Sequence, residues 1–277
     1  MLFRSGVMME GANATILVGW SLSAILSAAA LLVSIAGDLR RGTHLAAAAL
    51  MVAAALALYT HDVMALPQIC AALITGSAVG LASGQGIPRS RIPLLMGGLV
   101  GLAGVAAVLV GGAALRDPHA FGLLDDVTDR LRVVGAAGIG AGVSCGAMAC
   151  GGAAAMLRGG RADRLHILII AILLLAASGA IAAFVVAPDP ARLLACIGVT
   201  LVAGWAVTKR ALLAGMGPAL AVVSGFAGWA VAASAFLMEN MPMAVAGGLA
   251  GAAGSLFGVR LCVFAERKGL AHAGRRP

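Results

Sequence analysis

The sequence predicts an all-α membrane protein, with about nine transmembrane helices forming one domain over residues 1–277. Hydrophobic residues make up 61% of the chain and charged residues only 11%, and the mean hydropathy is +1.03, values that no ordinary soluble domain shows. Most apolar runs reach the roughly 20 residues that cross a hydrocarbon core of about 30 Å. Helices are expected because lipid offers no partner for free backbone groups, and the alternating pattern of a membrane β-barrel is absent from the sequence.

Nine apolar segments follow one another along the chain. The second and seventh are shorter than a full crossing. The last two are separated only by the turn that holds Glu239, Asn240 and Pro242. The predicted segments are 14–37, 45–60, 63–83, 93–115, 133–157, 165–187, 193–208, 217–238 and 241–264.

The longest break between segments is 116–132, with the sequence RDPHAFGLLDDVTDRLR. Asp125 or Asp126 is suited to cap a short helix, which would place Leu124, Val127 and Leu131 on one face. We therefore expect a short helix lying at the membrane interface here.

Charge orients the bundle. Fourteen of the nineteen Lys and Arg residues fall on one side of the predicted bundle, and five fall on the other. Basic residues favour the cytoplasmic side, so we predict the N-terminus outside and the C-terminus in the cytoplasm. The five basic residues on the outer side are Arg4, Arg116, Arg130, Arg132 and Arg192.

The net charge of +8 follows from this asymmetry. The basic residues are scattered singly or in pairs without interleaved aromatic residues, which indicates contact with lipid and excludes nucleic acid as a partner.

Residues that carry chemistry are scarce. The five cysteines fall inside apolar segments without CxxC spacing, and no histidine lies near them in sequence. The glycines near Gly138 and Gly84 lack the strand and helix that a dinucleotide loop requires. No charged residue lies at the centre of a segment, which argues against an ion pump built from this chain alone. We predict no catalytic, cofactor-binding or metal-ligating residue in this chain.

Small residues mark the last segment at spacings of three and four. Such residues let helix backbones approach closely in lipid, where packing drives association. We therefore predict that they pack the eighth and ninth segments together. The helix-packing residues are Gly247, Gly251, Gly254 and Gly258.

The order of several motifs resembles the membrane domain of the proton-translocating NAD(P) transhydrogenase β subunit, over nearly the whole chain. The last two segments are its most specific part. The matching features are SIAGDLRRG at 34–42, VAAVLVG at 105–111, GMGP at 215–218, SGFAGW at 224–229, the acidic turn at 239–240, the glycine-rich segment, and Cys262 with its basic exit.

The resemblance assigns a proton path whose polar residues are replaced in this chain. The family's membrane histidine falls on Val100, and its partner asparagine falls on Ser224. An acidic residue falls on Gly215 and a lysine falls near Ala153. Two small polar residues of the last helix fall on Ala252 and Ala253.

The resemblance also implies cofactors and partners. The family's subunit continues into an NADP(H)-binding domain, whereas this chain stops at Pro277, about thirteen residues after the last segment. We therefore expect NADP and NAD to be bound only by partner domains. Transhydrogenase-type nucleotide-binding subunits, lipid and a second copy of the chain are the expected partners. The expected location is a bacterial-type inner (plasma) membrane.

Three functions remain open from the sequence. The chain is a transhydrogenase-type subunit that depends on other chains for proton-coupled hydride transfer, a non-catalytic membrane scaffold or regulatory paralogue, or a small-solute transporter. The substituted positions leave open whether the chain is enzymatic. A transporter would require paired broken helices in an internal repeat, and the sequence has no such pairing.

Overall fold

The computed structural model describes residues 88–125, 130–159 and 167–273, together with scattered residues between 18 and 80. The chain forms two compact units, Met1–Pro88 and Arg89–Pro277. In the first unit, the described residues before Pro88 are all helical, and the Ser23 hydroxyl donates to the Ala49 carbonyl oxygen over 3.1 Å. The first three predicted segments otherwise lie outside the described residues.

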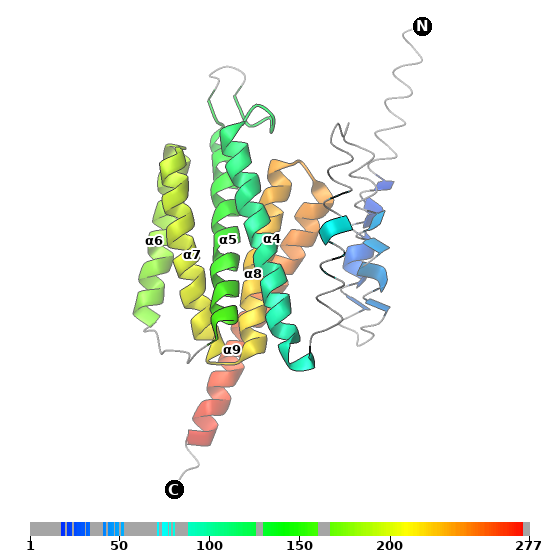
Figure 1. The fold of residues 1–277 in the computed structure, drawn as a ribbon, viewed down its shortest axis with the longest axis vertical. Coiled ribbons are helices and arrows are strands. Elements are labelled where there is room, and N and C mark those ends of the chain that lie inside the picture. The colour runs from blue at the N-terminus through cyan, green and yellow to red at the C-terminus, as the bar shows by residue number, and fades with distance from the viewer. Residues whose placement is uncertain are drawn as a thin grey trace. The chain divides into compact units, whose positions relative to one another are not determined.

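The second unit is a bundle of long helices (Figure 1). A single turn of 3-10 helix, Arg89–Arg91, leads into it. Each of its six helices is long and apolar enough to cross a membrane. The helical class and the six corresponding segments of the prediction are therefore confirmed. The helices are α4 (Ile92–Arg116), α5 (Val133–Arg158), α6 (Ile167–Val186), α7 (Pro190–Leu212), α8 (Met216–Leu237) and α9 (Met241–Ala273).

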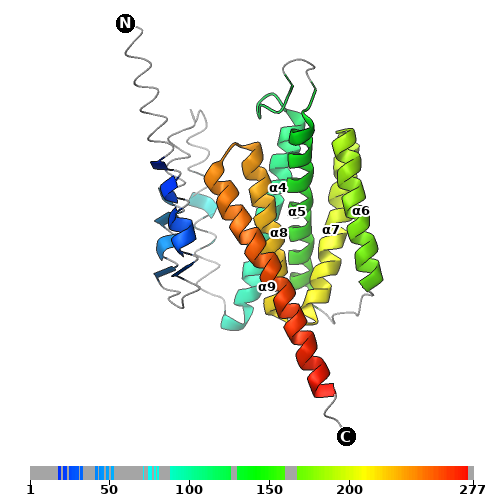
Figure 2. The ribbon, with the colours of Figure 1, turned by 180° about the vertical axis from the view of Figure 1, so that it is seen from behind.

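Two helices are longer than the hydropathy pattern predicted. Helix α7 begins at Pro190, whose fixed φ suits a first helical position, and the Asp189 carboxylate accepts from the Ala191 backbone N–H over 3.0 Å. Lys209 and Arg210 then continue α7 past the predicted end. Helix α9 continues nine residues beyond Phe264, and its last turns extend past the ends of α7 and α8 (Figure 2). The last apolar residue of a segment therefore does not mark the end of its helix.

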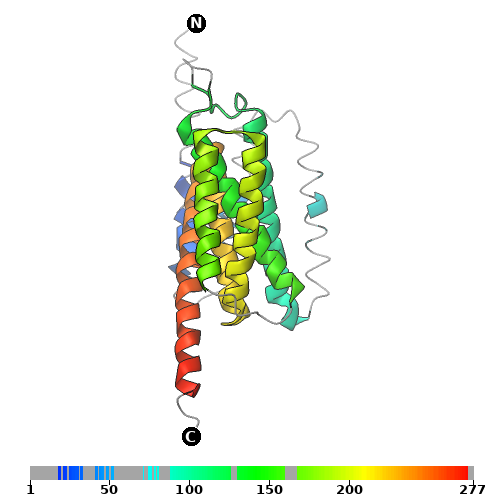
Figure 3. The same ribbon diagram turned by 90° about the vertical axis from the view of Figure 1, so that its left-hand side faces the viewer.

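Helix α5 occupies the centre of the unit, in contact with α4, α6, α7 and α8. Its Gly- and Ala-rich sequence explains this position, since small side chains let four neighbours approach its backbone. At one crossing, a Cβ on Gly104 of α4 would lie 2.5 Å from the Gly146 carbonyl oxygen of α5. Helix α6 packs beside α7 at the periphery (Figure 3), and Ile167, Leu168 and Leu175 are exposed there, as expected of a surface that faces lipid.

Helix α9 packs along α8 (Figure 2). A Cβ on Gly254 would lie 2.5 Å from the Gly225 backbone nitrogen, and Gly258 faces Val222 at 2.8 Å by the same measure. The Trp229 indole donates to the Ser255 hydroxyl over 3.1 Å across this interface. The two remaining glycines of the predicted set, Gly247 and Gly251, also face α8.

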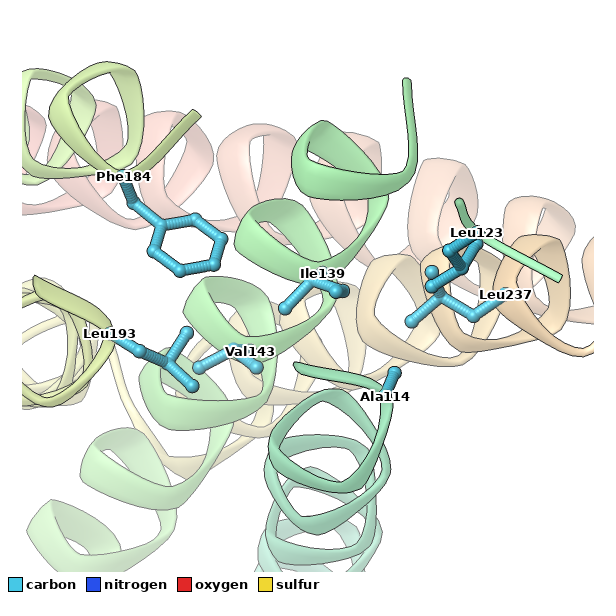
Figure 4. Close-up of a cluster of buried hydrophobic side chains, with 7 residues drawn as sticks. All are labelled: Ala114, Leu123, Ile139, Val143, Phe184, Leu193 and Leu237. Carbon is cyan, nitrogen blue, oxygen red and sulfur yellow. The ribbon is translucent and has the colours of Figure 1, made fainter. Parts of the chain in front are cut away.

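The break between α4 and α5 is not helical where the structure describes it. Leu124 and Leu131 form an isolated antiparallel bridge, supported by a 2.9 Å hydrogen bond from the Asp125 N–H to the Arg130 carbonyl. Contrary to the expectation, Leu124 and Leu131 therefore do not share one face of a helix but lie opposite each other in an extended pair, while Val127 lies outside the described residues. The extended pair instead carries Leu123 into the core, beside Leu237 of α8 (Figure 4).

Candidate functional site

The position that the resemblance assigns to a membrane histidine lies at a buried apolar junction of α4, α5, α7 and α8. Val100 is half-buried and packs against a cluster of buried apolar residues. Ala153 belongs to the same cluster, so the structure brings together two of the substituted positions. The buried members of this cluster, the Val100 junction, are Ala153, Met156, Ala211, Ala219 and Val223.

Close packing fills the Val100 junction. A Cβ on Gly101, the neighbour of Val100, would lie 2.5 Å from the Ala153 Cβ. Such an approach leaves no space for a water molecule between the two helices at that point. At Val100 and Ala153 the junction therefore offers neither a charged side chain nor a wet path.

Ser224 of α8 follows Val223, a member of the junction, but its hydroxyl is engaged locally. The Ser224 Oγ donates to the Ala221 carbonyl oxygen over 2.9 Å within α8. A hydroxyl that bonds back to its own helix is a common way to satisfy a serine in an apolar span. The hydrogen bond of the Ser224 hydroxyl is therefore satisfied within α8 and needs no partner from another helix.

The other substituted positions lie apart from the junction or are restricted by the backbone. Gly215 directly precedes α8 with φ 122° and ψ 174°, a conformation that is essentially confined to glycine. An acidic side chain at this position would strain the backbone, which gives a physical reason for the glycine. On α9, Ala252 is exposed and Ala253 is half-buried.

Polar side chains that the sequence did not single out line the contact between α5 and α7. The Ser144 Oγ lies 3.1 Å from the Cys196 Sγ, and both residues are buried. The Thr200 hydroxyl donates to the Cys196 carbonyl over 2.6 Å. Thr208, two turns further along α7, is fully buried, and its hydroxyl is without a hydrogen-bond partner among the described residues. Cys196, Thr200 and Thr208 are separated by four and eight residues on α7. This spacing places them on one face of a helix, and it was the feature of the sequence that could have predicted them.

Lys209 of α7 is a cation whose side chain is buried. Its Nζ donates to the Gly159 carbonyl oxygen over 2.9 Å and lies 5.6 Å from the centre of the Trp205 ring. Gly159 directly follows α5, whose C-terminal end carries partial negative charge. The ammonium therefore stabilises the end of α5, supported by a cation–π contact. The sequence placed Lys209 among the basic residues at the cytoplasmic ends of the helices and did not predict its burial.

The Asp, Glu, Lys, Arg and His residues of α4 to α9 lie toward the ends of the apolar spans, and the middle of each span has none of these five types. Within the described part of the chain, no group of three His, Cys, Asp or Glu side chains is placed to hold a metal ion. The bundle therefore packs tightly around small and apolar residues, with hydroxyls that bond mainly to their own helices.

These features define a polytopic helical membrane protein whose spans approach one another through glycine and alanine. A family model described as the NAD(P) transhydrogenase beta subunit matches residues 15–269. The chain belongs to the NAD(P) transhydrogenase beta subunit family. This membership agrees with the resemblance drawn from the motifs of the last two helices.

Proposed function

We propose that this chain is the membrane-embedded part of a transhydrogenase-type assembly, in which other chains bind NAD(H) and NADP(H). Family membership over 15–269 carries the proposal. The described residues support it because they are occupied by six membrane-length helices, whereas a dinucleotide site requires a βαβ unit. In this function, the bundle holds the nucleotide-binding partners at a membrane, for which we propose a bacterial-type inner membrane.

A second candidate function is a membrane scaffold or regulatory paralogue that does not move protons. The apolar packing of the Val100 junction favours it, because Val100 and Ala153 lie in one closely packed cluster. Proton movement through a bundle needs a titratable group or a polar water path near the centre. Among the substituted positions only Ser224 carries a hydroxyl, and this hydroxyl does not change charge near neutral pH.

The two functions differ in how the assembly couples its reactions. As a coupled subunit, the chain would make hydride transfer between the nucleotides sensitive to the proton gradient. As a scaffold, it would anchor the partners and leave the transfer rate unchanged when the gradient is collapsed. The coupled function would additionally require proton-carrying groups from another chain.

Reconstituted vesicles test both functions. The purified chain, alone and together with nucleotide-binding chains encoded beside it, would be assayed for NADPH-dependent reduction of an NAD analogue and for proton flux. We expect neither activity from the chain alone and hydride transfer from the assembly. Transfer that responds to a protonophore would support the coupled subunit, and transfer that ignores it would support the scaffold. Failure of any nucleotide-binding chain to associate would overturn the proposed assembly.

The same preparations test whether the chain associates with itself. We propose a second copy as a partner of the bundle, and mass photometry in detergent would distinguish a dimer from a single 27.3 kDa chain. A monomer at all concentrations would overturn that part of the proposal.

A further inference from the structure

A groove of about 650 Å³ lies where the α4–α5 connection meets the turn between α8 and α9. Apolar side chains form most of its lining, among them Phe121, Val134 and Phe236, while Arg132 and Glu239 bring one charge of each sign. The volume lies within the roughly 300–1,000 Å³ of typical ligand pockets. None of these residues belongs to the Val100 junction.

The groove lies at the ends of membrane spans. Arg132 directly precedes α5, and Glu239 follows the end of α8 by two residues. Residues at span ends lie at the boundary between hydrocarbon and headgroups. Val134 is 61% exposed and Phe236 is 56% exposed, so an acyl chain can reach the apolar wall.

The turn fixes the backbone that carries the acidic group. Glu239 has φ 52°, and the next residue, Asn240, donates its N–H to the Ala235 carbonyl over 2.8 Å. Asn240 also accepts from the Met243 N–H through its side chain over 3.1 Å, which caps α9. No hydrogen bond or ion pair engages the Glu239 carboxylate within the described part of the chain, where the turn is held by its backbone and by Asn240.

The backbone that carries the basic group is held as firmly. The Arg132 N–H donates to the Leu123 carbonyl over 2.9 Å, and the Arg132 carbonyl accepts from the Ala136 N–H over the same distance. A guanidinium has five N–H donors, so Arg132 can bind a phosphate while keeping another contact.

We propose that this groove binds one phospholipid whose headgroup carries both a phosphate and a primary ammonium, as phosphatidylethanolamine does. The Arg132 guanidinium binds the phosphate, the Glu239 carboxylate accepts from the ammonium, and an acyl chain lies along Val134 and Phe236. The pattern of one cation, one anion and an apolar wall selects this lipid. Phosphatidylglycerol has no cation for Glu239, and the quaternary ammonium of phosphatidylcholine has no N–H to donate. This inference does not depend on the proposed function.

Native mass spectrometry of the full chain tests the proposal. The delipidated protein in detergent would be titrated with phosphatidylethanolamine, phosphatidylglycerol and phosphatidylcholine that carry identical acyl chains. Since contacts between solvent-exposed charged groups are weak, we expect one phosphatidylethanolamine to bind about two- to fivefold more tightly than either other lipid. Equal retention of the three lipids would overturn the proposal.

Single substitutions localise the binding. Glu239→Gln should abolish the preference for phosphatidylethanolamine over phosphatidylcholine, and Arg132→Gln should weaken the binding of all three lipids. Arg130→Gln is the matched control, since Arg130 is exposed on the same connection and does not line the groove. Because Glu239 is exposed, the Glu239→Gln variant can be measured even if Arg132→Gln fails to fold. The inference would be refuted if the preference for phosphatidylethanolamine survives Glu239→Gln. It would also be refuted if the groove cross-links to residues 1–88 or to a second copy and retains no lipid.

Discussion

Gly228 of α8 lies directly against Gly251 of α9, so that a Cβ on Gly228 would overlap the Gly251 backbone nitrogen. From the other helix, a Cβ on Gly251 would lie 2.8 Å from the ring of Trp229, the residue after Gly228, and 2.9 Å from its backbone nitrogen. Neither helix can accept a larger side chain here without moving away from the other. The approach makes the van der Waals contact on which helix association in lipid depends.

Replacing Gly251 with leucine should therefore separate α8 from α9. We expect a loss of about 3 kcal/mol in the free energy of unfolding, because the overlap is with the Trp229 backbone nitrogen as well as its ring, so rotating the ring alone does not relieve it. Thermal unfolding in detergent would measure it. Gly248→Leu is the matched control, since a Cβ there meets nothing within 4 Å. Equal melting temperatures for the two variants would contradict the packing argument.

A second substitution addresses the backbone before α8. Gly215→Ala should cost about 1–3 kcal/mol, because a φ of 122° is open to glycine and strained for other residues. Gly217→Ala, two residues further on, should be neutral or slightly stabilising, since its Cβ meets nothing within 4 Å and alanine favours helix. Chemical denaturation of both variants checks this, and an unperturbed Gly215→Ala would show that the turn adapts.

The apolar packing of the Val100 junction predicts that a polar side chain at position 100 lowers the free energy of unfolding. Val100→Asn should destabilise the protein by about 1–3 kcal/mol more than Val100→Ala, because the amide is placed among apolar side chains without a partner. The alanine variant measures the lost packing alone. If the asparagine variant is the more stable of the two, the junction contains a polar partner or water, and the argument for a dry interior fails.

The predicted orientation is tested by labelling. Single cysteines at Asp126 and Arg161, in a protein without the native five cysteines, should react from opposite sides of the membrane. The expectation follows from the fourteen-to-five division of Lys and Arg. Labelling of both positions from the same side would contradict the predicted membrane crossing between them.

The sequence predicted the helices well where hydropathy alone decides them, as in α4 and α5. It shortened α7 because Lys209 and Arg210 interrupt the apolar run, although Lys209 is buried against Trp205 and the end of α5. Hydropathy treats a lysine as solvated, whereas a helix terminus and an aromatic ring can satisfy it.

The connection at 116–132 shows a different limit. Asp125 and the spacing of its leucines fitted a capped helix, yet the structure pairs Leu124 with Leu131 and buries Leu123. Local propensity could not show that Gly135, at the start of α5, leaves space for Leu123. Of the site, the sequence located Val100 and Ala153 but not the apolar cluster that they share, which depends on how α4 and α5 cross.

Thr208 provides the most direct test of the α5–α7 contact. Its hydroxyl is fully buried and without a partner among the described residues, which costs about 1–3 kcal/mol relative to a satisfied group. Thr208→Val keeps the shape and removes the hydroxyl, so the free energy of unfolding should rise by about 1 kcal/mol. Thr200→Val is the matched control on the same helix. It removes a hydroxyl that donates to the Cys196 carbonyl over 2.6 Å, so it should be neutral or destabilising. Thermal unfolding of both variants in the same detergent measures the difference. If Thr208→Val is instead the less stable variant, the hydroxyl has a partner in the folded protein, such as a buried water, and the contact between α5 and α7 is wet.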